Sequence, residues 1–205
     1  MEFFDYLVKT YGYNEAIMLD EISFADYSVS WIKKSLGQLC KECKIIRFEK
    51  GVYYIPTDTL LGKSKLDPKK VIIKKYINDG NDKIGYFSGM AFINMLGLST
   101  QMPNTLEIYT NNEPSRVREV PVGNQKVLLR RSRTEINREN SAVMSFLELM
   151  NFTDASFYDD DKKKIIKKFI EENGITRKSI SEYSPYFPDK TMRTLVESEV
   201  IYDVT

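Results

Sequence analysis

The sequence SVSWIKKSLGQLCKECKIIRFEKGVYYIP, residues 28–56, decides the fold of the amino-terminal part of the chain. In its first half, apolar residues recur every three or four positions, which places them on one face of an amphipathic helix. Two alternating runs follow, at 45–48 and 52–55, and Gly51 can adopt the positive φ that a tight hairpin between them needs. A helix followed at once by a hairpin is the layout of a winged helix-turn-helix.

The face of this helix opposite the apolar stripe is polar and cationic, and the tip of the hairpin is basic. Such a helix can enter the major groove of DNA while the hairpin contacts the backbone beside it. The residues expected to read base edges are Ser28, Ser30, Lys33 and Lys34. We expect Lys50 on the wing to contact phosphate or the minor groove, and Arg47 to contact phosphate.

Trp31 lies beside the centre of the apolar stripe, and two interpretations remain open. Aromatic side chains favour burial, which predicts that Trp31 packs against the wing or against a second domain. Otherwise it joins the DNA-binding residues and contacts the sugar-phosphate backbone or a thymine methyl group.

The chain as a whole is not a polycation, because 30 Lys and Arg residues against 29 Asp and Glu residues give a net charge of only +1. DNA binding must therefore rest on local basic patches. One patch beyond the hairpin is opposed along the sequence only by Glu119. Its arginines, which we expect to add backbone contacts, are Arg116, Arg118, Arg130, Arg131 and Arg133. The alternative interpretation is an ordinary solvated face.

The chain contains no histidine, which excludes Ser-His-Asp and Cys-His catalysis and histidine-ligated metal sites. Cys40 and Cys43 have the spacing of a zinc or redox half-site, but no second cysteine pair accompanies them. We therefore expect two small buried thiols in a reducing compartment. Glu107, with basic residues downstream, leaves a metal-dependent nuclease as a minor alternative that lacks the second carboxylate. The prediction is no catalytic residue, no metal, no cofactor and hence no enzyme.

The pattern of helices and strands predicts an α+β protein of two domains. Residues 1–60 are predicted to form the winged helix-turn-helix, and residues 61–205 a mixed α/β domain with a small, mainly antiparallel sheet and carboxy-terminal helices. The helices expected before the hairpin span 3–11, 15–22 and 28–43, and 57–67 is expected to be a linker. The later helices are expected at 68–77, 89–96, 139–151, 162–172, 177–183 and 188–199, and the strands at 85–87, 106–110, 117–122 and 127–132.

The amino-terminal segment MEFFDYLVKTYGYNEAI is acidic and aromatic, and it lacks the basic and apolar regions of a secretory signal. No stretch approaches the roughly 20 apolar residues that a membrane-spanning helix needs. We therefore expect a cytoplasmic protein without a membrane partner.

Two blocks of the sequence resemble a known family. The first, LGQLCKECKIIRFEKGVYYIP at residues 36–56, is similar to the winged-helix domain of the abortive-infection E-type antitoxins (AbiEi-like proteins). The second, YFSGMAFINMLGLSTQMPNTLEIYTNNEPSR at residues 86–116, is similar to the second motif of that family. There, a buried helix leads into a Leu-Gly-Leu-(Ser/Thr)-Thr-Gln-x-Pro turn and then a strand. The resemblance covers roughly residues 15–133.

The resemblance implies the antitoxin of a type IV toxin–antitoxin system in phage defence. Such an antitoxin represses transcription from its own promoter through the winged helix and counters a nucleotidyltransferase-like toxin without forming a stable complex with it. Because paired half-sites raise affinity and specificity together, a homodimer on an inverted repeat of double-stranded DNA fits this function. The alternative is a protein-interaction module that binds a toxin or another partner directly.

Overall fold

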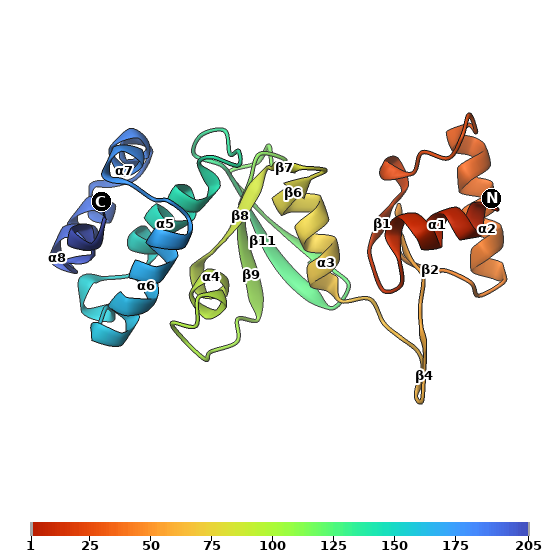
Figure 1. The fold of residues 1–205 in the computed structure, drawn as a ribbon, viewed down its shortest axis with the longest axis horizontal. Helices are drawn as coiled ribbons and strands as arrows, with labels where there is room; N and C mark the ends of the chain where they lie inside the picture. The colour runs from red at the N-terminus through yellow and green to blue at the C-terminus, as the bar shows by residue number, and fades with distance from the viewer. Residues whose placement is uncertain (1, 205) are drawn as a thin grey trace. The chain divides into compact units, whose positions relative to one another are not determined.

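The computed structural model describes residues 2–204, and the chain divides into two compact units, residues 1–74 and 75–205 (Figure 1). The division falls between Lys74 and Lys75 rather than near residue 60. Ion pairs join Lys70 to Glu15 and Lys74 to Glu21, the latter at 2.8 Å, so the segment after the wing belongs with the first unit. The α+β class predicted from the sequence is confirmed.

The first unit contains a three-stranded antiparallel sheet with two helices packed against it. Its elements are α1 (Phe3–Tyr11), β1 (Ile17–Met18), the 3-10 turn η1 (Leu19–Glu21), α2 (Val29–Lys41), β2 (Ile46–Glu49) and β3 (Val52–Tyr54). The strand order is β1-β3-β2, so the first strand completes the sheet of the wing. A core that includes Leu7, Ile17 and Leu36 joins these elements.

The helix predicted over 15–22 is wrong. Ile17 and Met18 instead pair with Tyr53 and Val52 as a short strand, and only a 3-10 turn follows. Ala16, Ile17 and Met18 are all buried. A run of consecutive buried residues fits a strand covered on both faces, whereas an amphipathic helix would expose some of them.

The helix and hairpin of residues 28–56 form as predicted. Ser28 caps α2, because its Oγ accepts a hydrogen bond of 3.3 Å from the backbone N–H of Trp31. Gly51 has a φ of +80°, which the tight turn of the wing requires. The helix ends at Lys41, however, and Cys43 follows it with a positive φ. Cys43 is therefore exposed and Cys40 half-buried, which corrects the prediction of two buried thiols.

The segment 57–67 is a hairpin rather than a linker. Its strands are β4 (Asp58–Thr59) and β5 (Gly62–Lys63), which pair in antiparallel fashion. Helix α3 (Pro68–Ile72) follows and continues into a π-helical turn, η2 (Ile73–Ile77). Proline occupies the first turn of α3, and the Asp67 carboxylate accepts a hydrogen bond from the backbone N–H of Lys69.

The second unit is built on a four-stranded mixed sheet of order β10-β11-β9-β8. These strands are β8 (Gly85–Ser88), β9 (Thr105–Thr110), β10 (Val117–Val122) and β11 (Gln125–Arg131), and a small hairpin of β6 (Asn78–Asp79) and β7 (Asp82–Lys83) precedes them. Strands β11 and β9 are parallel, and the other neighbours are antiparallel. At Gly85 a Cβ atom would lie 2.0 Å from the carbonyl oxygen of Tyr76, so only glycine lets η2 lie directly against β8.

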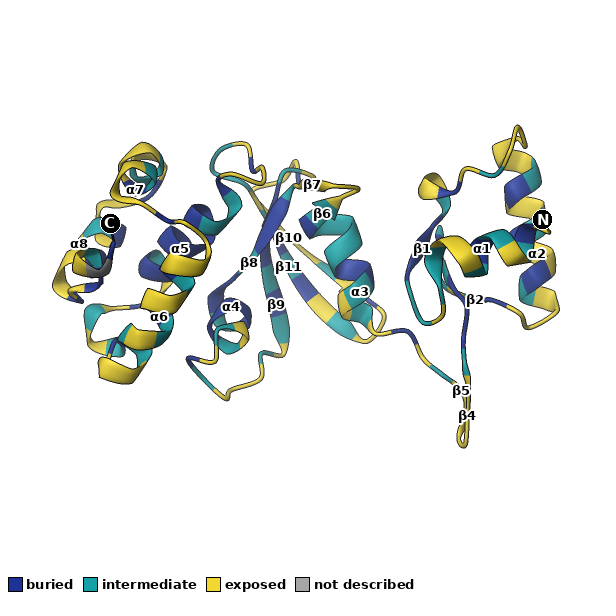
Figure 2. Cartoon of the chain, viewed as in Figure 1, coloured by how far each residue is buried: buried dark blue, intermediate teal, exposed yellow. Residues whose placement is uncertain are grey.

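The helices of the second unit form its largest core. They are α4 (Gly89–Met95), α5 (Ser141–Phe152), α6 (Asp160–Glu172), α7 (Arg177–Tyr183) and α8 (Asp189–Glu197), with 3-10 turns η3 (Ala155–Phe157), η4 (Ser184–Tyr186) and η5 (Val200–Asp203). Helix α5 is buried over most of its length (Figure 2). Within residues 2–204, no helix combines the length and the apolar character that crossing a bilayer demands.

Candidate nucleic-acid interface

The outer face of α2 presents an uncompensated positive charge to solvent. Ser30, Lys33 and Lys34 are exposed, and Ser28 is exposed at the amino-terminal end of the helix. Among the described residues, neither Lys33 nor Lys34 has a carboxylate within ion-pair distance. The apolar side of the same helix, with Ile32 and Leu36, is buried in the core of the first unit. The fold therefore fixes the helix and leaves its cationic face open.

The wing is held in place by η1. The backbone N–H of Leu19 donates a hydrogen bond of 2.9 Å to the carbonyl oxygen of Gly51, at the turn of the wing. Lys50, beside that turn, is exposed. Arg47 is also exposed, and its Nε donates to the carbonyl oxygen of Glu49 at 3.2 Å across a β-bulge. The wing thus carries two exposed cations on a fixed strand pair.

Trp31 packs against aromatic side chains of the first unit, which the sequence did not predict as its partners. Its ring stacks on Tyr27 with 4.0 Å between centroids, and it also contacts Phe3 and Phe24. These rings come from α1 and from the loop before α2. Trp31 therefore anchors the start of the predicted recognition helix to α1.

The predicted arginine strip of the second unit is largely neutralised by the fold. Arg118 forms an ion pair of 2.8 Å with the buried Glu113, and Arg130 forms one with Glu107. Arg116 and Arg131 are exposed, and in the part of the chain that the structure describes they have no carboxylate partner. The backbone N–H of Arg131 bonds the carbonyl oxygen of Arg116, so these two lie side by side. Of the five arginines, Arg116 and Arg131 are thus the two that are exposed without a carboxylate partner among the described residues.

Arg133 belongs to a buried polar cluster, which also contains Tyr86, Tyr109, Glu148 and Asn151. Its Nε lies 2.9 Å from a carboxylate oxygen of Glu148, and its guanidinium lies over the rings of Tyr109 and Phe187. Glu148 also accepts hydrogen bonds from the Tyr109 hydroxyl and from Asn151.

Burial governs the ionisation of this cluster. It raises the pKa of Tyr109 to about 12, with the Glu148 charge adding to the effect. Burial alone would lower the pKa of Arg133, but the hydrogen bonds and charge of Glu148 outweigh it and the net shift is upward. Arg133 is therefore a cation held by Glu148, with about a quarter of its side chain exposed.

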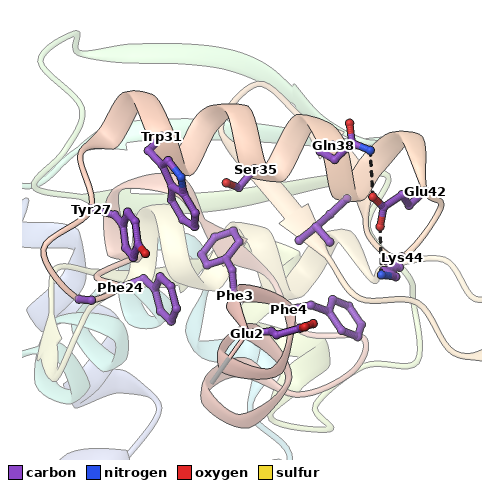
Figure 3. A pocket seen from close by; sticks show the side chains of 12 residues that line it. Glu2, Phe3, Phe4, Phe24, Tyr27, Trp31, Ser35, Gln38, Glu42 and Lys44 are labelled. Atoms are coloured by element: carbon purple, nitrogen blue, oxygen red, sulfur yellow. Dashed lines mark hydrogen bonds and ion pairs between the residues drawn. The ribbon is translucent and has the colours of Figure 1, made fainter.

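Two apolar features of the first unit were not predicted as functional. Leu60 and Leu61 form the tip of the β4–β5 hairpin and are fully exposed. A groove of about 670 Å³ lies between α1 and α2 (Figure 3), and among its lining residues are Phe3, Tyr27 and Trp31. The only sequence signal for the hairpin is a pair of leucines followed by glycine in a polar segment. No short sequence motif predicts the groove, because the residues that line it come from three separate segments of the chain.

Within residues 2–204, no group of three or more Cys, Asp or Glu side chains is placed to hold a metal ion. Glu107 is paired with Arg130, and its carboxylate lies close to Gly89.

The chain belongs to the family described as "Family of unknown function (DUF6088)", whose model matches residues 9–177. The match runs through the winged-helix unit and most of the second unit. A comparison with curated proteins found no match.

Proposed function

We propose that this protein is a DNA-binding transcriptional autorepressor that serves as the antitoxin of a type IV toxin–antitoxin system. The observation that carries the proposal is the exposed cationic face of α2, where Lys33 and Lys34 have no carboxylate partner among the described residues, on a helix followed by a basic wing. This is the arrangement with which a winged helix reads the major groove and contacts the flanking backbone. A cytoplasmic location is part of the proposal.

In the proposed complex, the amino-terminal half of α2 lies in the major groove. Ser28 and Ser30 are short enough for close approach to base edges, and Lys33 and Lys34 reach guanine or phosphate. Arg47 and Lys50 contact phosphates beside the site. Arg116 and Arg131 are the residues of the second unit that remain available for a further backbone contact.

The antitoxin part of the proposal rests on the resemblance of residues 36–56 and 86–116 to the abortive-infection E-type antitoxins. In that role the functional partner is a nucleotidyltransferase-like toxin, countered without a stable complex. The second unit would carry the antitoxin action, and the winged helix would carry repression.

A mobility-shift titration tests the repressor function. The probe is the DNA immediately upstream of the gene for this protein, with scrambled DNA as competitor. We expect specific binding by the wild type and its loss in Lys33→Ala/Lys34→Ala. The matched control is Lys164→Ala/Lys168→Ala, which removes the same charge from the exposed face of α6 and should leave binding intact.

No preference for the upstream DNA over scrambled competitor would contradict autorepression. Retention of a toxin by the immobilised protein at high salt would then support the alternative, a module that binds its partner directly. Binding lost equally in the α6 control would mean that only overall charge matters, which would contradict a recognition role for α2.

A further inference from the structure

The β4–β5 hairpin is a fixed structure that exposes two leucines. At its base, the backbone N–H of Thr57 donates to Ser64 Oγ at 2.9 Å, and the Tyr54 hydroxyl donates to the Ser64 carbonyl oxygen at 3.0 Å. Asn14 also bonds to both Thr57 and Ser64. The tip nevertheless leaves Leu60 and Leu61 fully exposed. Adjacent apolar side chains held out by an ordered hairpin indicate a surface that becomes covered.

The same unit also carries an apolar groove, between α1 and α2, that could receive such a hairpin tip. Figure 3 shows the rings of Phe3, Phe24, Tyr27 and Trp31 facing into it. Tyr27 remains 50% exposed although it stacks on Trp31. A volume of about 670 Å³ has room for a pair of aliphatic side chains.

The charges around the two features are complementary. Glu2 and Glu42 lie at the edge of the groove, and Glu42 is bonded to Gln38 and to Lys44. These two partners lower the pKa of Glu42, which keeps its carboxylate ionised. On the hairpin, Lys63 lies 3.8 Å from Asp58, while Lys65 has no carboxylate partner in the described part of the chain. Because Lys44 at the groove pairs with Glu42 and Lys63 pairs with Asp58, Glu2 at the groove and Lys65 on the hairpin are left as charges of opposite sign.

We propose that two copies of this chain form a reciprocal dimer, in which the hairpin tip of each copy inserts Leu60 and Leu61 into the α1–α2 groove of the other. Full exposure of both leucines means that the hairpin does not occupy its own groove. In a dimer with two-fold symmetry, the hairpin of each copy fills the groove of the other. Both hairpins and both grooves are then covered by one contact repeated twice. The dimer does not require DNA, but it would bring two recognition helices to an inverted repeat.

Trp31 lies in the proposed contact and is the only tryptophan of the chain, so its fluorescence reports on the groove. Sedimentation velocity of the full chain over a range of concentrations should show a monomer–dimer equilibrium, and Trp31 emission should shift to the blue as the dimer forms. Leu60→Ser/Leu61→Ser should raise the dimer dissociation constant by about tenfold or more. The emission of this variant should then stay independent of concentration.

Three further variants separate the contact from general effects. Met102→Ser removes another exposed apolar side chain, from the second unit, and should leave the dimer intact. Lys33→Ala/Lys34→Ala should also remain dimeric, so failure of DNA binding and failure of the dimer are distinguishable. Tyr27→Ser changes the groove instead of the hairpin, and it should also raise the dimer dissociation constant measured by sedimentation velocity.

Mixing supplies the sharpest test, because the hairpin variant retains an intact groove and Tyr27→Ser retains an intact hairpin. The mixture should associate more strongly than either variant alone. A wild-type protein that stays monomeric at every concentration would overturn the proposal. A dimer unchanged by Leu60→Ser/Leu61→Ser, or no gain on mixing, would overturn it as well.

Discussion

The basic residues of the two units look alike in the sequence and differ in the structure. Lys33 and Lys34 face solvent without a carboxylate partner among the described residues, whereas Arg118, Arg130 and Arg133 are each paired with a glutamate. Glu107 and Glu148 come from other segments than the arginines they pair with, Glu113 lies five residues before Arg118, and Glu113 and Glu148 are buried. A cluster of positive charge is therefore a binding surface only when the fold brings no acid to it. This difference is why the proposal places DNA binding in the first unit, while Arg118, Arg130 and Arg133 of the second unit are held in ion pairs.

The largest expected effect is on the stability of the second unit. Arg133→Ala leaves the carboxylate of Glu148, 5% exposed, without its cation. Removing one partner of a buried ion pair costs about 3–5 kcal/mol of unfolding free energy. Urea unfolding followed by circular dichroism should show this loss, and the control Arg131→Ala, an exposed neighbour, should stay within about 0.5 kcal/mol of wild type.

If Arg133→Ala and Arg131→Ala unfolded at the same urea concentration, the contrast between paired and unpaired basic residues would fail at Arg133. Arg133 would then behave as a surface cation and return to the set of candidate phosphate contacts. A combined Arg133→Met/Glu148→Met variant sharpens the point, because removing both charges should cost less than removing one.

A smaller effect concerns the pH dependence of the Arg118–Glu113 pair. Burial raises the pKa of Glu113, but hydrogen bonds from Ser115 and Arg118 and the Arg118 charge outweigh it, and the net pKa lies below its usual value of 4.5. Because the folded pKa is the lower one, the pair stabilises the fold above pH 4.5 and loses this contribution as the pH falls through the folded pKa.

Thermal melts of the wild type and Glu113→Gln from pH 7 down to pH 3 check this prediction. The stability difference between the two proteins should shrink below about pH 4.5. A constant difference across the range would mean that the Glu113 carboxylate makes no net contribution as an ion. Among the paired arginines of the second unit, only Arg130 and Arg133 would then support the contrast with Lys33 and Lys34.

The smallest expected effect is on the stability of the first unit. Lys33→Ala/Lys34→Ala removes two exposed charges that have no partner within the described residues, and alanine favours helix, so unfolding free energy should change by no more than about 0.5 kcal/mol. Urea unfolding measures it. A loss above 2 kcal/mol would contradict the description of this face as separable from the core.

The local parts of the fold follow from the sequence. The helices at 3–11 and 177–183 form with the predicted bounds, and the turn at Gly51 forms as predicted. Each depends on residues within one or two turns of chain, where apolar periodicity and capping chemistry act. The helix predicted at 15–22 was wrong because β1 depends on a non-local contact. It forms by pairing with β3, which lies far along the sequence.

The candidate site divides in the same way. The exposed face of α2 could be predicted, because the helix period alone separates its apolar and cationic sides. The pairing of Arg133 with Glu148 could not be predicted, because it joins the end of β11 to α5 and depends on tertiary packing. The aromatic partners of Trp31 come from α1 and the preceding loop, for which spacing gives no signal.

The most direct test of the account is the salt dependence of binding to the upstream DNA, measured by fluorescence anisotropy with a labelled duplex. Each lost phosphate contact lowers the slope of log affinity against log salt by about one. The account predicts a lower slope for Lys50→Ala and for Lys33→Ala/Lys34→Ala, and an unchanged slope for Arg118→Ala, whose charge is held by Glu113. An unchanged slope in both lysine variants, or a drop confined to Arg118→Ala, would contradict the assignment of DNA binding to the first unit.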